Sequence, residues 1–382
     1  MNPAPQSGRL LSLDAFRGAT IAGMLLVNNP GSWSDLYAPL EHAPWHGWTP
    51  TDMIFPFFLW IVGLSMTLSF ARRMEQGADR GVLLRHVVVR AAIIVGVGLF
   101  LVAFPFGLLP AHNFSLAKMR LPGVLQRIGV CYLVAGAIFL HTSWKGRAAW
   151  VAGLLLGYWA LLKFVPVPGY GAGVLEPQGN LAWWIDSNLL AGHTWSGAPV
   201  AGFDPEGVLS TIPAIATTLL GALAGDLGRA FSGARLSQRL AGIGLVLLAV
   251  GAVWGLVFPI NKNLWTSSYA VFMAGWAMLL LGGFHWLIDV RGWKRWATPL
   301  VIYGSNALAM FVLAGLIGKL LFLIKWTGPD GKAVTLKTWI FQGFFVPLAS
   351  PVNASLLFAI AFVLVFFLFA WLLWRKKWFL KI

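Results

Sequence analysis

The sequence has few charged residues for its length. Only 11% of its 382 residues are Asp, Glu, Lys or Arg, whereas 58% are hydrophobic. About 25% of the residues in soluble domains are charged, so this composition excludes an ordinary soluble domain. The apolar residues come in runs that could cross a bilayer, for which a helix needs about 20 residues. We therefore expect an all-α, polytopic integral membrane protein with a single transmembrane domain over residues 1–382.

Cysteine is almost absent, and Cys131 lies in an apolar run. One cysteine excludes an intrachain disulfide and a cysteine-based metal site. His42 and His46 have a spacing that suits zinc on a helix, but Pro44 between them disfavours a regular helix. We therefore expect no metal. A hydrophobic segment typical of a signal peptide is also missing from the first nine residues, so insertion is expected to start with the first span.

Acidic residues are scarce as well, with 13 acids against 28 bases and a net charge of +15. In a soluble protein this balance would suggest nucleic acid as a partner. Here the bases lie in alternate connections between apolar runs, which is the positive-inside pattern. They are Arg72, Arg73, Arg80, Arg85, Lys145, Arg147, Arg229, Arg235, Arg239, Arg291, Lys294, Arg295, Arg375, Lys376, Lys377 and Lys381. The pattern predicts cytoplasmic N- and C-termini in a lipid bilayer and no nucleic-acid partner.

About ten transmembrane helices are expected. Their approximate ranges are 11–29, 51–70, 84–104, 121–141, 147–165, 207–228, 238–258, 267–288, 299–324 and 352–374. The longest outward loop, at about 166–206, contains three tryptophans, and connections of this length are often functional. No internal repeat is visible, so the inverted repeats of many transporters are not supported.

Polar groups within membrane spans are costly and indicate function. Asp14 and Arg17 are three residues apart and share one helix face, where a structural ion pair is the alternative. Asn28 ends the first run, where a C-terminal cap is the alternative; Asp52 opens the second run, where an N-cap would also explain it. The other candidates are Gln126, Arg127, Asp204, Glu206, Asn261, Lys262, Trp265 and Asn306. Together they predict a polar cavity that opens outward, as a membrane enzyme or a transporter needs.

Several motifs resemble one family in their order along the chain. They are LSLDAFRG (11–18), LVNNPGSW (26–33), EHAPWHGWTPTDMIFPFFLWIVG (41–63), RLPGVLQRIG, FDPEGVLSTI, NKNLWTSSY, YGSNAL and RKKWFLKI. The sequence is similar in this respect to the heparan-alpha-glucosaminide N-acetyltransferases and their shorter bacterial relatives. The resemblance implies a multi-pass acyltransferase of the bacterial inner membrane, with homodimerisation possible. It also implies cytoplasmic acetyl-CoA as co-substrate and, as acceptor on the periplasmic side, glucosamine or a glucosamine-ended saccharide.

The resemblance also implies roles for two residues. The active histidine of the family precedes Ala-x-Trp, as His42 does, and its functional asparagine follows a valine at the end of a span, as Asn28 does. Histidine is a suitable base for acetyl transfer to an amine, although His42 could also carry the acetyl group covalently. Asn28 could stabilise the oxyanion, and Asp52 could orient His42.

Other residues are expected to bind the two substrates. Arg127, together with Arg17, suits a phosphate of CoA, and Arg127 could instead hold the pantetheine arm or Glu206. Trp45, Trp48 and Trp265 offer flat faces for a sugar, although aromatics at a membrane interface also serve as anchors. The alternative function is an amino-sugar transporter for N-acetylglucosamine.

Overall fold

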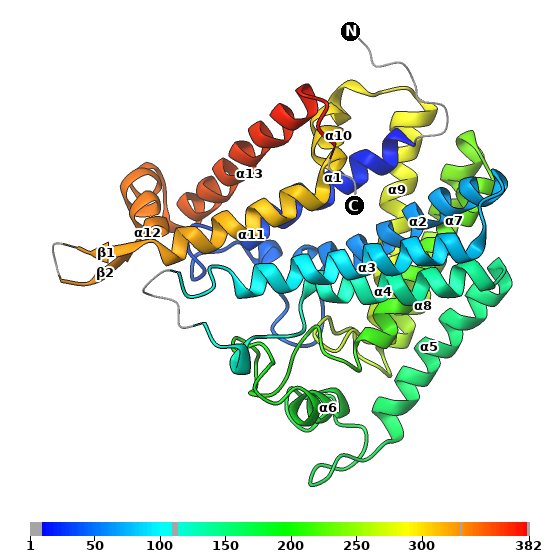
Figure 1. The fold of residues 1–382 in the computed structure, drawn as a ribbon, viewed down its shortest axis with the longest axis horizontal. Helices are drawn as coiled ribbons and strands as arrows, with labels where there is room; N and C mark the ends of the chain where they lie inside the picture. The colour runs from blue at the N-terminus through cyan, green and yellow to red at the C-terminus, as the bar shows by residue number, and fades with distance from the viewer. Residues whose placement is uncertain (1–9, 109–113, 329–330, 380–382) are drawn as a thin grey trace.

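The computed structural model describes residues 10–108, 114–328 and 331–379, and Lys381 lies outside these ranges. The described chain is almost wholly helical (Figure 1). Its longer helices are α1 (Leu11–Asn28), α2 (Ile54–Glu75), α3 (Arg80–Ala103), α4 (Val124–His141), α5 (Trp144–Phe164), α7 (Thr211–Ala230), α8 (Gly233–Gly255), α9 (Ser267–His285), α10 (Thr298–Ser305), α11 (Ala307–Leu323) and α13 (Pro351–Arg375).

Shorter elements lie in the connections. They are α6 (Leu181–Leu189), α12 (Leu336–Ile340), the hairpin of β1 (Lys325–Thr327) and β2 (Ala333–Thr335), and the helical turns η1 (Ala38–Leu40), η2 (Pro50–Met53), η3 (Leu116–Lys118), η4 (Trp286–Val290), η5 (Arg295–Ala297), η6 (Phe341–Phe345) and η7 (Val346–Leu348). The hairpin is antiparallel, with Trp326 opposite Val334. Neither α6 nor the hairpin was expected, because each is too short to leave a clear periodic signal in the sequence.

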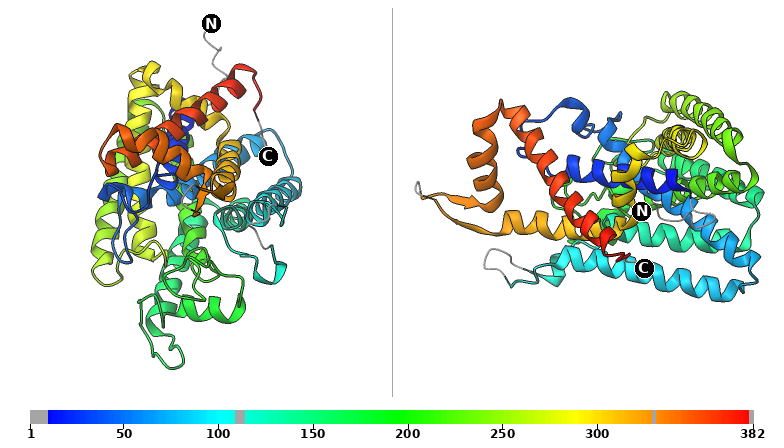
Figure 2. Two further views of the ribbon diagram at one scale, coloured as in Figure 1. Left: turned by 90° about the vertical axis from the view of Figure 1, so that its left-hand side faces the viewer. Right: turned by 90° about the horizontal axis from the view of Figure 1, so that it is seen from above.

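Two apolar cores organise the bundle. The larger core joins α2, α3, α4, α5, α7, α8 and α9, and the smaller core joins α10, α11 and α13. Helix α1 contributes to both, with Phe16 in the larger and Leu25 in the smaller core. In Figure 2, α11, α12, α13 and the hairpin accordingly lie to one side of the other helices. Helix α1 therefore helps to pack the two parts together, as do Phe58 of α2 and the hydrogen bonds of Lys319 in α11 to the end of α3.

Glycine allows α1 to approach α10 closely. A Cβ atom on Gly18 would lie 1.7 Å from the carbonyl oxygen of Leu300, and one on Gly304 would lie 2.0 Å from that of Asp14. Small residues at such crossings let two backbones meet, which is a common device where lipid supplies no hydrophobic drive between helices. The crossing fixes the N-terminal half of α1, and hence the direction in which its C-terminal end points.

All ten expected apolar runs coincide with helices. Seven of the described helices are long and apolar enough to cross a membrane, or eight if α10 and α11 form one bent span. The other two, α1 and α5, do not meet that criterion, and α5 carries Lys145, Arg147 and Lys163. The run expected at 299–324 differs most, because it bends by 69° at Asn306. The all-α membrane architecture is confirmed, and the number of spans stays a prediction.

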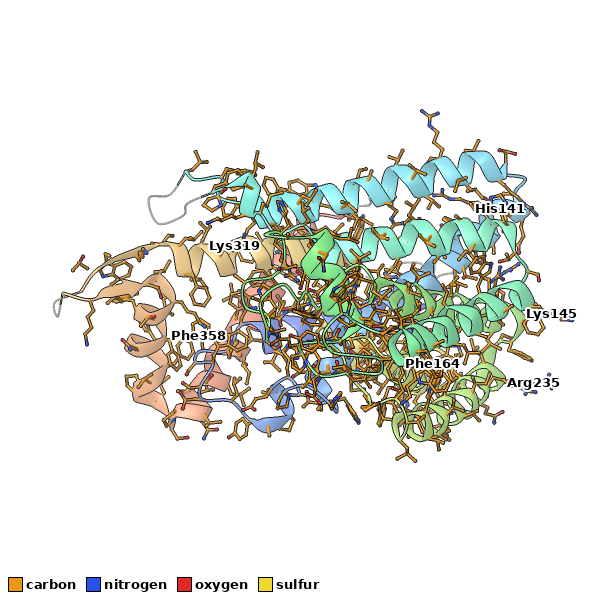
Figure 3. All side chains as sticks on the ribbon, turned by 90° about the horizontal axis from the view of Figure 1, so that it is seen from below. His141, Lys145, Phe164, Arg235, Lys319 and Phe358 are labelled. Atoms are coloured by element: carbon orange, nitrogen blue, oxygen red, sulfur yellow. The ribbon has the colours of Figure 1, made fainter. Side chains whose placement is uncertain are left out.

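The bases of the connections between α2 and α3, α4 and α5, and α7 and α8 lie at one end of the bundle, which we call the basic end. Helices α2, α4 and α7 end there, and α3, α5 and α8 begin there. Ion pairs tie this end together, with Arg147 Nη2 at 2.7 Å from Asp226 Oδ2 and Arg229 Nη2 at 2.7 Å from Glu75 Oε1. Lys145 and Arg235 lie at the same end in Figure 3. The connections at 29–53, 166–210 and 256–266 lie at the opposite end, which we call the His42 end.

Candidate active site

His42 and Asp52 form a hydrogen-bonded pair at the His42 end. His42 Nδ1 lies 2.7 Å from Asp52 Oδ1. The histidine side chain is 46% exposed, whereas that of Asp52 is 1% exposed. A carboxylate accepts the proton on Nδ1, and the other ring nitrogen, Nε2, then carries the lone pair that a general base needs. The pairing expected from the sequence is present.

Asp52 is held in place by the start of α2. It occupies the third position of a capping box in which Thr49 is the N-cap, and its Oδ2 accepts from the Thr49 backbone N–H at 3.1 Å. The same oxygen accepts from the Ala43 N–H at 3.0 Å. Tyr269 of α9 donates its hydroxyl to the Asp52 carbonyl at 2.6 Å. Asp52 thus acts both as a helix cap and as the partner of His42, because one carboxylate oxygen caps the helix while the other faces the imidazole.

Lys262 completes a three-residue cluster. Its Nζ lies 3.0 Å from His42 Nδ1, 3.4 Å from His42 Nε2 and 3.4 Å from Asp52 Oδ1. Burial lowers the pKa of Lys262, while the charges of Asp52 and Glu206 act in the opposite direction. A partly buried ammonium in this position places a cation beside both the base and its carboxylate partner.

The loop that carries Lys262 is fixed by its own hydrogen bonds. Asn261 accepts from the Leu264 N–H at 2.8 Å, and Thr266 Oγ1 accepts from the Asn261 N–H at 3.0 Å. Trp265 has a φ of +51°, in the left-handed region that bulky residues avoid. Such a strained residue persists only where its surroundings hold it, and Trp265 Nε1 donates to Thr217 Oγ1 at 3.0 Å. Lys262 is therefore presented by a rigid loop.

A second ionic cluster lies beside the first. Arg120 binds Asp204 with two hydrogen bonds, of 2.8 and 2.6 Å, and also pairs with Glu206. Asp204 further accepts from the Trp195 N–H at 2.9 Å, and the Arg120 guanidinium lies over the Trp195 ring. Arg120 was not among the sequence candidates. No local signal marked it, because Arg120 lies two residues after Lys118 in a connection without acids.

Arg127 has a different role from the one expected. It is buried, donates to Gly207 O at 3.1 Å and Ser210 Oγ at 2.5 Å, and stacks on Trp265 at 5.3 Å. Among the described contacts, Glu206 pairs with Arg120, and no ion pair joins it to Arg127. Arg127 braces the start of α7 against the Lys262 loop.

Several other candidates are also buried in the structure. Besides Asp52, the almost fully buried candidates are Arg127, Asp204, Asn261, Trp265 and Asn306. Asn306 donates to the Trp378 carbonyl at 3.0 Å, at the bend between α10 and α11. Trp265 cannot serve as a platform for a sugar, because protein atoms cover its ring. Asn261 and Trp265 support the Lys262 loop from behind, whereas the hydrogen bond of Asn306 joins a different part of the fold.

Trp45 and His46 belong to the exposed rim of the site. Trp45 Nε1 donates to the Leu175 carbonyl at 2.8 Å, and its ring packs on Phe203 at 5.5 Å, so that it docks onto the 166–206 connection. His46 Nδ1 lies 3.3 Å from Asn261 Nδ2. The rim is thus built from three connections that are far apart in the sequence.

Several expected site residues do not contact this cluster. Asn28 is exposed, and within the described ranges it has no hydrogen bond to His42 or Asp52. Asp14 and Arg17 pair at 3.1 Å near the start of α1, and Arg17 also donates to Ser65 Oγ at 2.7 Å. Gln126 is buried at the start of α4. The structure therefore separates Asp14 and Arg17 from His42 by most of the length of α1.

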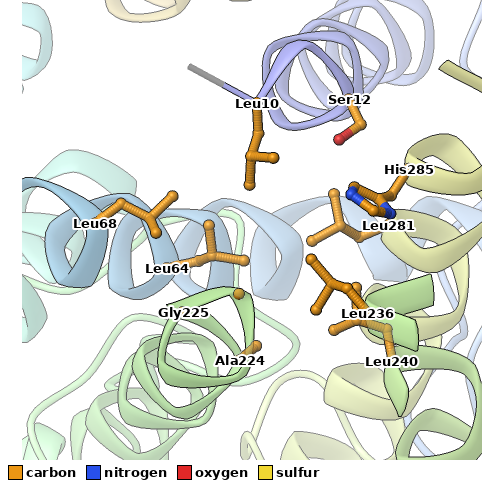
Figure 4. A pocket seen from close by; sticks show the side chains of 11 residues that line it. Leu10, Ser12, Leu64, Leu68, Ala224, Gly225, Leu236, Leu240, Leu281 and His285 are labelled. Carbon is orange, nitrogen blue, oxygen red and sulfur yellow. The ribbon is translucent and has the colours of Figure 1, made fainter. Parts of the chain in front are cut away.

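Two hollows lie away from His42. An apolar pocket between α1, α2, α7, α8 and α9 is lined mainly by leucines, with Ser12 and His285 at its edge (Figure 4). A groove of about 190 Å³ lies between α2, α3 and α4, and its lining includes Arg73, His86 and Arg90 but no acid. The groove is therefore positively charged and suits an anion.

Asp186, in α6, is a buried carboxyl group without a cation partner among the described contacts. Its Oδ1 accepts from the Val208 N–H at 2.9 Å, whereas its Oδ2 has no hydrogen bond within the described chain. Burial raises the pKa of Asp186 to about 7. Between about pH 4 and 7 the folded protein then binds a proton that the unfolded chain has lost. Stability therefore falls as pH rises, by about 1.4 kcal/mol per unit at most.

Asp186→Asn is accordingly expected to stabilise the protein most at pH 8, much less at pH 5 and little at pH 4. The amide keeps an acceptor for Val208 but cannot ionise. The measurement is the melting temperature in detergent across this pH range. Glu176→Gln, an exposed site in the same connection, is the control. Equal pH dependence in native protein and Asp186→Asn would contradict the assignment.

The fold and the site together define a class, a multi-pass helical membrane protein with a His–Asp–Lys cluster at one end of its bundle. The family model described as "Heparan-alpha-glucosaminide N-acetyltransferase, catalytic" matches residues 9–258, and the chain belongs to this family. The resemblance inferred from the motifs and the expected acyltransferase class are both confirmed. Membership of this family does not favour the transporter alternative.

Two relatives carry the name heparan-alpha-glucosaminide N-acetyltransferase. The protein of Mus musculus is 31% identical over 358 residues, which cover 80% of this chain and 53% of that protein. The protein of Homo sapiens is 30% identical over 358 residues, which cover 80% of this chain and 52% of that protein. The chain thus spans about half the length of the curated relatives it matches. His42 and Asp52 lie within the range of the family model, and Lys262 lies beyond it.

Proposed function

We propose that this protein transfers the acetyl group of cytoplasmic acetyl-CoA to an amino sugar on the other side of a bacterial inner membrane. The acceptor is glucosamine or a saccharide that ends in glucosamine. The observation that carries the proposal is the cluster of His42, Asp52 and Lys262, in which an exposed imidazole is oriented by a buried carboxylate. Family membership supports the same reaction class.

His42 acts as the general base in the proposed reaction. The acceptor amine gives a proton to His42 Nε2 as its nitrogen attacks the thioester carbonyl carbon. The carbon–sulfur bond of the resulting tetrahedral intermediate then breaks, and the thiolate of CoA takes the proton back from Nε2. Asp52 keeps the proton on Nδ1 throughout and stabilises the imidazolium that forms. We propose direct transfer, in which His42 carries no acetyl group.

Lys262 and Glu206 contact the two substrates beside His42 in the proposed reaction. The Lys262 ammonium lies within 3.4 Å of both ring nitrogens and can donate to the carbonyl oxygen as negative charge develops there. Asn28, which stands at the exposed end of α1, is the second oxyanion donor in this proposal. Glu206 lies close enough to oppose the lowering of the Lys262 pKa, and its carboxylate suits the hydroxyl groups of a sugar.

The phosphates of acetyl-CoA are assigned to the face of α2 that leads to the basic end. Ser65, Ser69 and Arg73 follow one another at intervals of four residues and share that face. Ser65, the hydrogen-bond partner of Arg17, lies about 20 Å from Asp52 along the helix axis. An extended pantetheine arm with its pyrophosphate can bridge such a distance. Arg17 would then meet the pyrophosphate, and Arg73 and Arg90 of the basic groove would meet the 3′-phosphate.

Arg90→Gln is expected to raise KM for acetyl-CoA by about tenfold and to leave kcat nearly unchanged. One charge-assisted hydrogen bond contributes about 1.5 kcal/mol or more, and about 1.4 kcal/mol corresponds to a factor of ten. The same variant should discriminate little against acetyl-dephospho-CoA, which lacks the 3′-phosphate. Arg85→Gln, an exposed position on α3 outside the groove lining, is the control. An equal increase in KM for both donors would move the phosphate site elsewhere.

The direct test uses purified protein with acetyl-CoA and glucosamine. Free CoA and N-acetylglucosamine should appear in equal amounts. In vesicles with acetyl-CoA inside, the product should appear outside. Saturable sugar uptake without acetyl-CoA, and no acetyl transfer to any amino sugar, would overturn the proposal in favour of transport. A homodimer, which the resemblance implied, stays a prediction.

A further inference from the structure

We propose that Lys262 is itself an acetyl acceptor, so that the protein acetylates its own lysine when no amino sugar is bound. The inference rests on the proposed function and adds a modification site to it. Lys262 Nζ is a primary amine that lies 3.4 Å from His42 Nε2, the nitrogen left free when Nδ1 binds Asp52. An acceptor amine must occupy a similar position relative to the base, within hydrogen-bond reach of it.

The surroundings of Lys262 make its amine a suitable nucleophile for acetyl-CoA. Its loop is held by the hydrogen bonds of Asn261 and Thr266 and by buried Trp265, so the amine is presented in one position. Its side chain is 21% exposed, which leaves it open to a substrate. Burial also lowers the pKa of Lys262, so its neutral, nucleophilic form is more abundant at a given pH than for a solvated lysine.

The reaction balances without any further reagent. Lys262 first releases one proton to solvent and becomes neutral. Its nitrogen attacks the thioester carbonyl carbon of acetyl-CoA while a second N–H proton passes to His42 Nε2. The carbon–sulfur bond breaks, and the departing thiolate takes that proton. The products are CoA and N-acetyl-Lys262.

Acetylation of Lys262 would abolish acetyl transfer at this site. The amide has no positive charge, so its ion pair with Asp52 and its donation toward the thioester oxygen are both lost. Its acetyl group would also stand beside the His42 ring, where an acceptor amine must bind. The protein would thus lose activity when acetyl-CoA is present without an acceptor, and an acceptor would protect it.

The experiment is peptide mass spectrometry after incubation of the purified native protein with deuterated acetyl-CoA and no sugar. We expect the label on Lys262 to exceed that on Lys163 and Lys325 by about tenfold or more, although these two lysines are more exposed. The label should fall to the level of Lys163 in His42→Ala and should decrease when glucosamine is added. Hydroxylamine treatment distinguishes the sites, because it removes acetyl from histidine and leaves acetyl-lysine intact.

Lys262→Arg gives a second readout, because arginine keeps the positive charge but is not acetylated under these conditions. The rate of acetyl transfer to glucosamine by the native protein should fall as preincubation with acetyl-CoA becomes longer. The rate of Lys262→Arg should be the same before and after this preincubation. Turnover of glucosamine without label on Lys262, or equal label in His42→Ala, would overturn the inference alone. Absence of both label and turnover would overturn the proposed function as well.

Discussion

His42→Ala is expected to reduce the rate of acetyl transfer to glucosamine by about 10²–10⁴-fold, the usual contribution of a positioned general base. The imidazole is the exposed partner of a buried carboxylate. Asp52→Asn should approach the same loss, because the amide cannot accept the Nδ1 proton as a carboxylate does. It would favour the wrong tautomer of His42 while preserving the size of the side chain.

The measurement is the release of CoA and of N-acetylglucosamine under saturating donor and acceptor. His141→Ala, the same substitution at an exposed position at the basic end, serves as the control and should retain the native rate. His46→Ala tests the second histidine, which pairs with Asn261. A large loss in His46→Ala, with activity retained in His42→Ala, would move the base to His46. Retention of activity in both variants would show that neither His42 nor His46 is the base.

Arg120→Met is expected to destabilise the protein by about 3 kcal/mol, as removal of one partner from a buried ion pair does. Asp204 has no exposed surface and would lose both hydrogen bonds of a bidentate pair. Asp204 also holds the Trp195 and Glu206 backbone N–H groups, so the connection beside Lys262 would loosen. We therefore expect lower acetyl transfer at 37 °C together with a lower melting temperature.

Two further variants separate charge from geometry. Arg120→Lys keeps the charge but not the two parallel hydrogen bonds, and it should recover only part of the stability. The double variant Arg120→Met with Asp204→Asn removes the uncompensated buried charge and should be more stable than Arg120→Met alone. The measurement is thermal unfolding in detergent, in parallel with the CoA-release assay. A native melting temperature in Arg120→Met would show that the cluster does not stabilise this connection.

The candidate site was predictable to the extent that its signals are local. Asp52 follows Thr49 and Pro50 at the start of an apolar run, and the capping box that this pattern predicts is present. His42 stood out as a polar, titratable group between two spans. Arg120 and Asp186 were missed, because their importance lies in partners that are 84 and 22 residues away along the chain.

Hydropathy and charge are properties of consecutive residues, so the helical membrane class, the positions of the apolar helices and the bases in alternate connections were predictable. Which polar groups meet depends on tertiary contacts. Lys262 reaches His42 across 220 residues, Trp265 turns inward as its backbone adopts a positive φ, and the last predicted spans include one that bends at Asn306. The contacts of Lys262 and Trp265 depend on how loops at the His42 end pack together, whereas the bend at Asn306 accompanies its hydrogen bond to Trp378. Contacts between such distant segments leave no periodic trace in the sequence.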